Sequence, residues 1–177
     1  AAANFFDGSG HAALIGTVNG KKFHMDSPFI MSGRCSDPSF RSSGWTVLRL
    51  REYPSGVNTV ADLEKMRKEH PEKIEQWQKY RADVLKRVNQ YFEAMRRSPY
   101  EYNSNYLETK VFDKKTRDTW RTQIFPKEGK AQCPIDSVYC SELPATGFAL
   151  ADEEIAGRLP RGLSILTAIN AFEGTTL

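Results

Sequence analysis

The sequence predicts an α+β protein, in which an antiparallel sheet near the start of the chain is followed by helices. Residues 11–25 form two short β-prone runs joined by Asn19-Gly20, the strongest short hairpin signal. Residues 74–95 carry apolar side chains three or four positions apart, which is typical of an amphipathic helix. A further helix is predicted late in the chain, at 138–151. An antiparallel hairpin combined with separate helices indicates the α+β class.

The composition is that of an ordinary globular domain. The chain has 177 residues, of which 40% are hydrophobic and 27% charged, and we expect a single domain with a helical insertion at about 59–97. The formal net charge of +3 is small and the basic residues are spread along the chain, which argues against nucleic acid as a partner. No apolar run is long enough to span a bilayer and no signal peptide is visible, so stable membrane insertion is not expected.

The first strands carry two of the three histidines. His11 opens the first run, and His24 lies near the end of the second, before Pro28. An antiparallel hairpin folds these two positions back toward each other. The segment 32–44 is rich in Ser, Gly, Asp and Pro and is predicted to be loop, and 45–52 is predicted to be a third strand.

The helical region is predicted from its caps and its period. Thr59 can cap a short helix that ends near Glu69, and Pro71 suits the first turn of a second, long helix. The charges between the apolar positions of the long helix mix both signs, which favours a solvated face over a partner-binding one.

The second half of the chain is predicted to return to strands before the last helix. Ser98-Pro99 ends the long helix, and residues 106–112 and 120–125 are predicted to form a hairpin. Residues 126–134 are predicted to be loop. Pro144 would lie in the first turns of the helix at 138–151, where proline is tolerated.

A nucleophilic thiol is the chemistry that the residues suggest. Cys140 lies where a helix is predicted to begin, and the N–H groups and dipole of a helix N-terminus favour a thiolate and can stabilise an oxyanion. His11 and His24 are the candidate bases, because His70 precedes a helix proline in the most charged region and is interpreted as a surface or capping residue. The alternative is that both histidines are structural residues on strand faces. The spacing of the cysteines does not suggest zinc, and no cofactor is expected.

Four short segments, in chain order, resemble a known family. They are His11-Ala12-Ala13-Leu14-Ile15-Gly16, Phe23-His24-Met25-Asp26-Ser27-Pro28, Ser98-Pro99-Tyr100-Glu101-Tyr102-Asn103 and Val138-Tyr139-Cys140-Ser141-Glu142-Leu143. Together they resemble the YiiX-like cysteine hydrolases, which are permuted relatives of the NlpC-type papain-like peptidases. The two histidines are similar to those of the lecithin retinol acyltransferase branch. The chain departs from the family pattern in having no recognisable strand before His11, and a proline at Pro144.

The resemblance implies a permuted papain-like fold, with a central antiparallel sheet and a nucleophile-bearing helix. It implies that Cys140 attacks a carbonyl carbon and that His11 takes the proton of the thiol. His24 would orient the imidazole of His11, with Asp26 as the reserve for that role. Tyr100 matches a position whose phenol helps to form the oxyanion hole, and simple packing is the equal alternative for this side chain.

The resemblance also implies the function classes. The first is an amide hydrolase that acts on peptide stems of peptidoglycan, as a secreted antibacterial effector with an immunity protein as partner and a secreted or periplasmic location. The second is a lipid-directed thiol acyltransferase or lipase, which needs a long apolar groove or a membrane face. The third is a non-catalytic binding module in which Cys140 is an inert thiol. The absence of an amphipathic membrane segment in the sequence favours the first class over the second.

The remaining cysteines allow one disulfide. If the protein works in an oxidising compartment, Cys140 must stay free, and Cys35–Cys133 is the only compatible pair. Both residues lie in segments predicted to be loop. Such a bridge would connect the loop after the histidine hairpin to the loop before the nucleophile.

Overall fold

The computed structural model describes residues 3–6, 12–26, 34–36, 46–98, 100–102, 113–138, 142–156 and 172–176. Its main feature is a six-stranded sheet in the order β4-β3-β2-β1-β5-β8, in which all neighbouring strands are antiparallel. The strands are β1 (Ala3–Phe6), β2 (Ala12–Val18), β3 (Lys21–Asp26), β4 (Arg34–Ser36), β5 (Thr46–Leu50) and β8 (Phe172–Thr176). A separate parallel pair joins β6 (Glu101–Tyr102) to β7 (Ser137–Val138).

The predicted hairpin at the start of the chain is confirmed. Asn19 and Gly20 have φ angles of 49° and 78° between β2 and β3. Two consecutive residues with positive φ match the type I′ turn, whose twist suits a two-residue hairpin, and Asn-Gly is the pair that tolerates it best. The third predicted strand is also confirmed as β5. A strand not predicted from the sequence, β1, precedes His11 and lies between β2 and β5.

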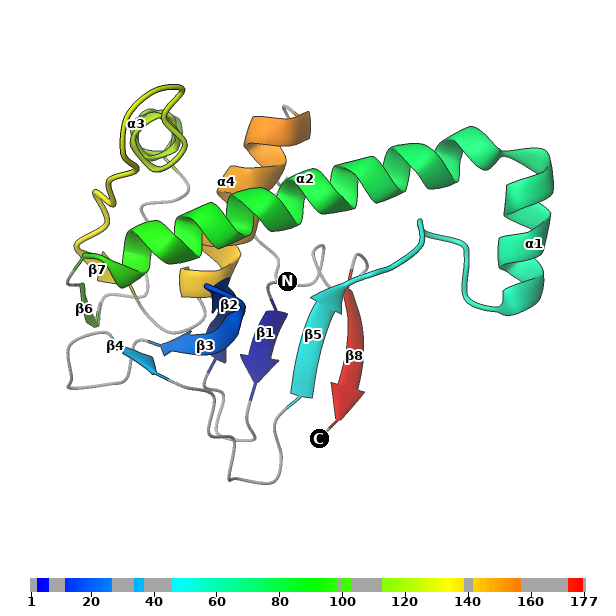
Figure 1. Ribbon diagram of the computed structural model, residues 1–177, viewed down its shortest axis with the longest axis horizontal. Helices are drawn as coiled ribbons and strands as arrows, with labels where there is room; N and C mark the ends of the chain where they lie inside the picture. Colours follow the sequence, from blue (N-terminus) through cyan, green and yellow to red (C-terminus); the bar gives the residue numbers. More distant parts are fainter. Residues whose placement is uncertain are drawn as a thin grey trace.

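Among the described residues, four helices accompany the sheet (Figure 1). They are α1 (Val60–Glu69), α2 (Pro71–Arg96), α3 (Lys114–Ile124) and α4 (Glu142–Ala156). Thr59 caps α1 as predicted, and its hydroxyl and the carboxylate of Asp62 complete a reciprocal capping box. Pro71 opens α2 as predicted. His70 lies between the two helices, exposed to solvent, and makes no side-chain hydrogen bond to a helix N-terminus.

Helix α2 has two different halves. Residues 71–83 include no buried side chain, and together with α1 they extend beyond the β8 edge of the sheet (Figure 1). The second half contributes six buried residues, Val84, Val88, Tyr91, Phe92, Ala94 and Met95. This half contacts both β2 and α4, so the hydrophobic core lies between the sheet and these two helices.

The predicted strand at 120–125 is wrong, because this segment is the end of α3. The side chain of Asp113 accepts a hydrogen bond from the Thr116 N–H and so caps the helix. The buried residues of α3 are Arg117, Trp120 and Ile124, spaced three and four apart, which is the helical period. Residues 106–112, the other half of the predicted hairpin, lie outside the described residues.

Three further boundaries differ from the sequence prediction. Cys35 was expected in a loop but lies in β4, where it pairs with Met25. The last helix begins to be described at Glu142 and continues to Ala156, five residues beyond the predicted end, while Val138 belongs to β7. The final strand, β8, pairs with β5 along its whole length and was not predicted. The predicted loop at 126–134 contains no helix or strand, as expected.

Candidate functional site

The two residues that matter most to the predicted chemistry, Cys140 and His11, lie outside the described residues. The elements next to them are described. His11 immediately precedes β2, and Cys140 stands two positions before the first residue of α4. Helix α4 contacts β2 directly, so the segment that follows the predicted nucleophile packs against the strand that follows the predicted base.

The Pro-Tyr segment also comes to this region. Tyr100 is followed by β6, and β6 pairs in parallel with β7, which ends two residues before Cys140. The paired positions are Glu101 with Ser137 and Tyr102 with Val138. Segments that are some 36 residues apart in the sequence (138 − 102) are therefore hydrogen-bonded neighbours just before α4 begins.

The hairpin register determines how His24 and Asp26 relate to the start of β2. His24 pairs with Ile15, and Asp26 pairs with Ala13. Position 26 is therefore paired with the second residue of β2, and position 24 with the fourth. The register places Asp26, the reserve residue, nearer to the start of β2 than His24.

The alternation of the strands adds a second constraint. Leu14 and Met25 pair with each other and are fully buried on the side of the sheet that α2 covers. The Leu14–Met25 pair therefore marks the face of the β2–β3 hairpin that packs against α2. His11 precedes the described strand, so the alternation of β2 does not assign it to either face.

The first turn of α4 is deeply buried. Leu143 is fully buried and Glu142 is 3% exposed, although Glu142 is a carboxylic acid. An acidic residue in the first turn of a helix interacts favourably with the helix dipole. Pro144 has no N–H, so it adds no backbone donor to this first turn.

Tyr91 of α2 anchors this first turn. Its hydroxyl donates a hydrogen bond of 3.0 Å to the carbonyl oxygen of Leu143, and the residue is fully buried. Its ring lies against the backbone of Gly147, where an added Cβ would be 2.7 Å from the ring atom Cδ1. Burial raises the pKa of Tyr91 well above its ordinary value. Negative charge on Cys133, Tyr100 or Glu142 would raise the pKa of Tyr91 further.

Tyr100 is 3% exposed and belongs to the hydrophobic core. The packing role that was one of its two interpretations is therefore observed. The oxyanion role stays a prediction, because Cys140, the predicted nucleophile, lies outside the described residues.

The predicted Cys35–Cys133 bridge is wrong, since Cys133 carries a free thiol. Its sulfur lies 2.9 Å from Sδ of Met95 in α2, so the residue packs as part of the core. Burial raises the pKa of the Cys133 thiol to about 11. A thiol with this pKa is almost entirely protonated at neutral pH and is a poor nucleophile.

The far end of α4 is held by buried charge. Glu153 accepts hydrogen bonds from Arg117 Nε at 3.1 Å and forms an ion pair with Arg121 Nη1 at 3.0 Å, both from α3. The side chains of Arg117 and Glu153 are each 7% exposed. On the α2 side, the Tyr80 hydroxyl donates to Asp152 Oδ1 at 2.7 Å. Helix α4 is thus fixed at both ends by side chains of other helices.

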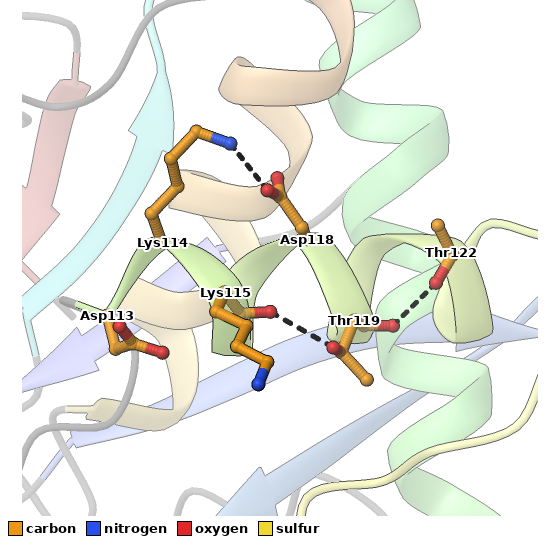
Figure 2. Close-up of a pocket in the computed structure, with 6 residues that line it drawn as sticks. All are labelled: Asp113, Lys114, Lys115, Asp118, Thr119 and Thr122. Carbon is orange, nitrogen blue, oxygen red and sulfur yellow. Dashed lines mark hydrogen bonds and ion pairs between the residues drawn. The ribbon is translucent and has the colours of Figure 1, made fainter.

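A shallow hollow on α3 has no features of a catalytic site (Figure 2). Its lining comes from a single helix and its cap, namely Asp113, Lys114, Lys115, Asp118, Thr119 and Thr122. The Lys114 ammonium pairs with Asp118, and the hydroxyls of Thr119 and Thr122 donate to carbonyl oxygens of α3 (Figure 2). These contacts satisfy the polar groups within the helix, and the hollow includes none of the predicted site residues.

Within the part of the chain that the structure describes, no group of three or more His, Cys, Asp or Glu side chains could hold a metal ion. No helix among these residues is long and apolar enough to cross a membrane. The chain matches no protein-family model, no curated protein and no solved structure.

The sequence did not single out Tyr91, Glu142 or Gly147. Tyr91 was one apolar position among many on α2, and its partner Gly147 lies 56 residues away (147 − 91). The one sequence signal was a glycine inside a predicted helix, which costs about 1 kcal/mol relative to alanine and often has a packing reason.

Proposed function

We propose that this protein is a cysteine hydrolase that cleaves amide bonds, with Cys140 as nucleophile and His11 as general base. One observation carries the proposal. Helix α4 starts two residues after Cys140, its first turn is buried, and it packs against β2, which starts at the residue after His11. The dipole of a helix N-terminus at this point would favour the thiolate form of Cys140.

In the proposed reaction, His11 accepts the thiol proton and the sulfur of Cys140 attacks the carbonyl carbon. The C–N bond then breaks, His11 gives the proton to the departing amine, and an acyl-thioester forms on Cys140. Water, deprotonated by His11, attacks the thioester and releases the acid and the free thiol. The backbone N–H of Cys140 would be one of the donors that stabilise the oxyanion.

The other predicted residues keep proposed roles. Asp26 or His24 would orient the imidazole of His11, and the hairpin register favours Asp26. Tyr100 would support the oxyanion region, since it directly precedes the strand that pairs beside β7. The proposed substrate class is the peptide stem of peptidoglycan, cleaved by a secreted effector.

The test is a product analysis with two substrates and two cysteine variants. Wild type, Cys140→Ala and Cys133→Ala are incubated with purified peptidoglycan and, separately, with phospholipid vesicles, and products are identified by mass. New amine and carboxyl termini in the peptide stems from wild type and Cys133→Ala, but not from Cys140→Ala, are the expected result. Cys133→Ala is the matched control because its thiol is buried and protonated. Release of fatty acid from the vesicles, with no cleavage of peptidoglycan, would instead indicate a lipid-directed acyltransferase or lipase. Product formation by Cys140→Ala would refute Cys140 as the nucleophile.

A further inference from the structure

We propose that Tyr91 is a positioning residue for the predicted nucleophile, because its hydroxyl and ring together hold the first turn of α4 in place. The inference rests on the proposed function, since it concerns the geometry of Cys140. Tyr91 itself comes from α2, a helix that carries none of the residues predicted to take part in the chemistry.

Two contacts of Tyr91 restrain α4 in different ways. The hydroxyl donates to the carbonyl oxygen of Leu143, three residues after Cys140, at 3.0 Å. The ring lies on the backbone of Gly147, one turn further along the helix, where only hydrogen fits between ring and backbone. The hydrogen bond resists sliding and rotation of α4, and the ring contact determines how closely the two helices approach.

The neighbouring residue on α2 makes the same kind of contact with the sheet. The ring of Phe92 lies on the backbone of Gly16 in β2, where an added Cβ would be 2.2 Å from the ring atom Cγ. Two consecutive aromatic residues therefore hold α4 and β2 at once. These are the helix after Cys140 and the strand after His11, so the pair sets the distance between the two segments.

The Tyr91 hydroxyl remains a donor over the whole pH range in which a catalytic thiol titrates. Burial raises the pKa of this phenol, so it does not ionise between about pH 5 and 9. Any change in the reactivity of Cys140 over this range that follows removal of the hydroxyl then reports the lost hydrogen bond, since Tyr91 itself does not titrate.

A pair of tyrosine variants separates positioning from general helix packing. Tyr91→Phe removes the hydroxyl that reaches Leu143, near Cys140. Tyr80→Phe removes a hydroxyl on the same helix that donates to Asp152, at the other end of α4. The rate of Cys140 modification by iodoacetamide is measured from pH 5 to 9 by peptide mass mapping, well below the unfolding temperature of each variant.

We expect Tyr91→Phe to raise the apparent thiolate pKa of Cys140 by about one unit, which slows alkylation below both pKa values about tenfold. The Tyr80→Phe profile should coincide with that of wild type. Coinciding profiles for all three proteins would overturn the positioning role and leave the proposed function standing. A wild-type Cys140 that reacts like an ordinary thiol would overturn the proposed function, and the positioning role with it.

Gly147→Ala provides a second route to the same answer if Tyr91→Phe does not fold. The added methyl displaces the Tyr91 ring but leaves the hydroxyl in the chain. The same slowing of Cys140 alkylation is expected, and a wild-type profile in a folded Gly147→Ala protein would count against the inference.

Discussion

Replacing Gly16 by alanine would put a methyl group inside the ring of Phe92. An ideal Cβ at position 16 would lie 2.2, 2.4 and 2.6 Å from the ring atoms Cγ, Cδ1 and Cδ2. Gly16 is buried in β2, and Phe92 is fully buried on α2, so neither side has open space to move into. The cost of the substitution is therefore decided by how far a packed aromatic ring can shift.

The expected loss of stability follows from two opposing effects. Carbon atoms in contact prefer about 3.5–4.0 Å, so the ring must move by more than about 1 Å. Overpacking of this kind costs about 1–3 kcal/mol in a dense core. Alanine in place of glycine within a strand gains about 0.5–1 kcal/mol in backbone entropy. Because three ring atoms lie within 2.6 Å of the added methyl, the overpacking cost should be near the upper end of that range, about 3 kcal/mol. After the gain of up to about 1 kcal/mol, we expect Gly16→Ala to lower the free energy of unfolding by about 2 kcal/mol, measured by urea unfolding followed by circular dichroism.

A double-mutant cycle shows whether the Phe92 ring is the cause. Phe92→Leu alone should cost about 1–3 kcal/mol, because it leaves a cavity over Gly16. In Gly16→Ala/Phe92→Leu the methyl occupies part of that cavity, so the double variant should be about as stable as Phe92→Leu alone. Strict additivity of the two single effects, or a Gly16→Ala protein as stable as wild type, would refute this description of the interface.

Three more predictions concern the supports around the site. Asn89→Ala should lower the free energy of unfolding by about 2 kcal/mol, because the side-chain amide of Asn89 accepts one hydrogen bond from the backbone of β2 at 2.9 Å and donates another at 3.1 Å. A loss near zero in urea unfolding would show that these two hydrogen bonds contribute nothing. The pKa of Cys133 is about 11 in the folded protein, above its unfolded value of 9.0, so this thiol contributes stability below pH 9 that is lost as the pH rises to 11. Cys133→Ala should remove this contribution to the fall in the free energy of unfolding between pH 9 and 11. An unchanged dependence of the free energy of unfolding on pH would contradict the raised pKa. Glu153→Gln should lower the free energy of unfolding by about 3 kcal/mol, because it removes the buried carboxylate that pairs with Arg117. Glu154→Gln is the control, since Glu154 is 33% exposed and its loss should cost less than about 1 kcal/mol. Equal losses of stability in the two variants, measured by thermal or urea unfolding, would argue against the buried pair.

The parts of the fold that depend on near neighbours in the sequence were predictable. Asn19-Gly20 forms the hairpin because these two residues tolerate positive φ, whatever the rest of the chain does. Thr59 begins α1 through a capping box with Asp62, three residues away. The start of α2 at Pro71 likewise needs only the geometry of proline.

The errors in predicted secondary structure occur where contacts between residues far apart in the sequence, or a weak helical periodicity, determine the structure. Trp120 and Phe125 are β-prone, which favoured a strand at 120–125. The helical spacing of α3 includes Arg117, a charged residue that is buried together with its ion-pair partner Glu153. Strand β8 exists because β5 offers it a partner more than a hundred residues earlier in the chain. No local pattern announces either contact.

The candidate site divides in the same way. The residue types that could do the chemistry were visible in the sequence, and the elements after His11 and Cys140 were predicted with the right kind of structure. The residues that position those elements were not, because Tyr91 and Gly147 have meaning only as a pair across two helices. Asn89 is a similar case, since an asparagine within an amphipathic helix gives no sign that it pairs with a strand.

The geometry of the proposed site depends on two glycines, Gly16 and Gly147. An aromatic ring that lies directly on a backbone determines a distance more closely than one that packs on a flexible side chain, because the backbone cannot rotate away. Tyr91 and Phe92 make such contacts on Gly147 and Gly16, and they follow each other on one rigid helix. Helix α2 therefore holds both α4, which follows Cys140, and β2, which follows His11. A methyl group at either glycine would change the distance between α4 and β2, and a change of about 1 Å is enough to break a catalytic hydrogen bond. If the proposed chemistry is correct, Gly16→Ala and Gly147→Ala should each lower the hydrolysis rate at temperatures where the variant is still fully folded.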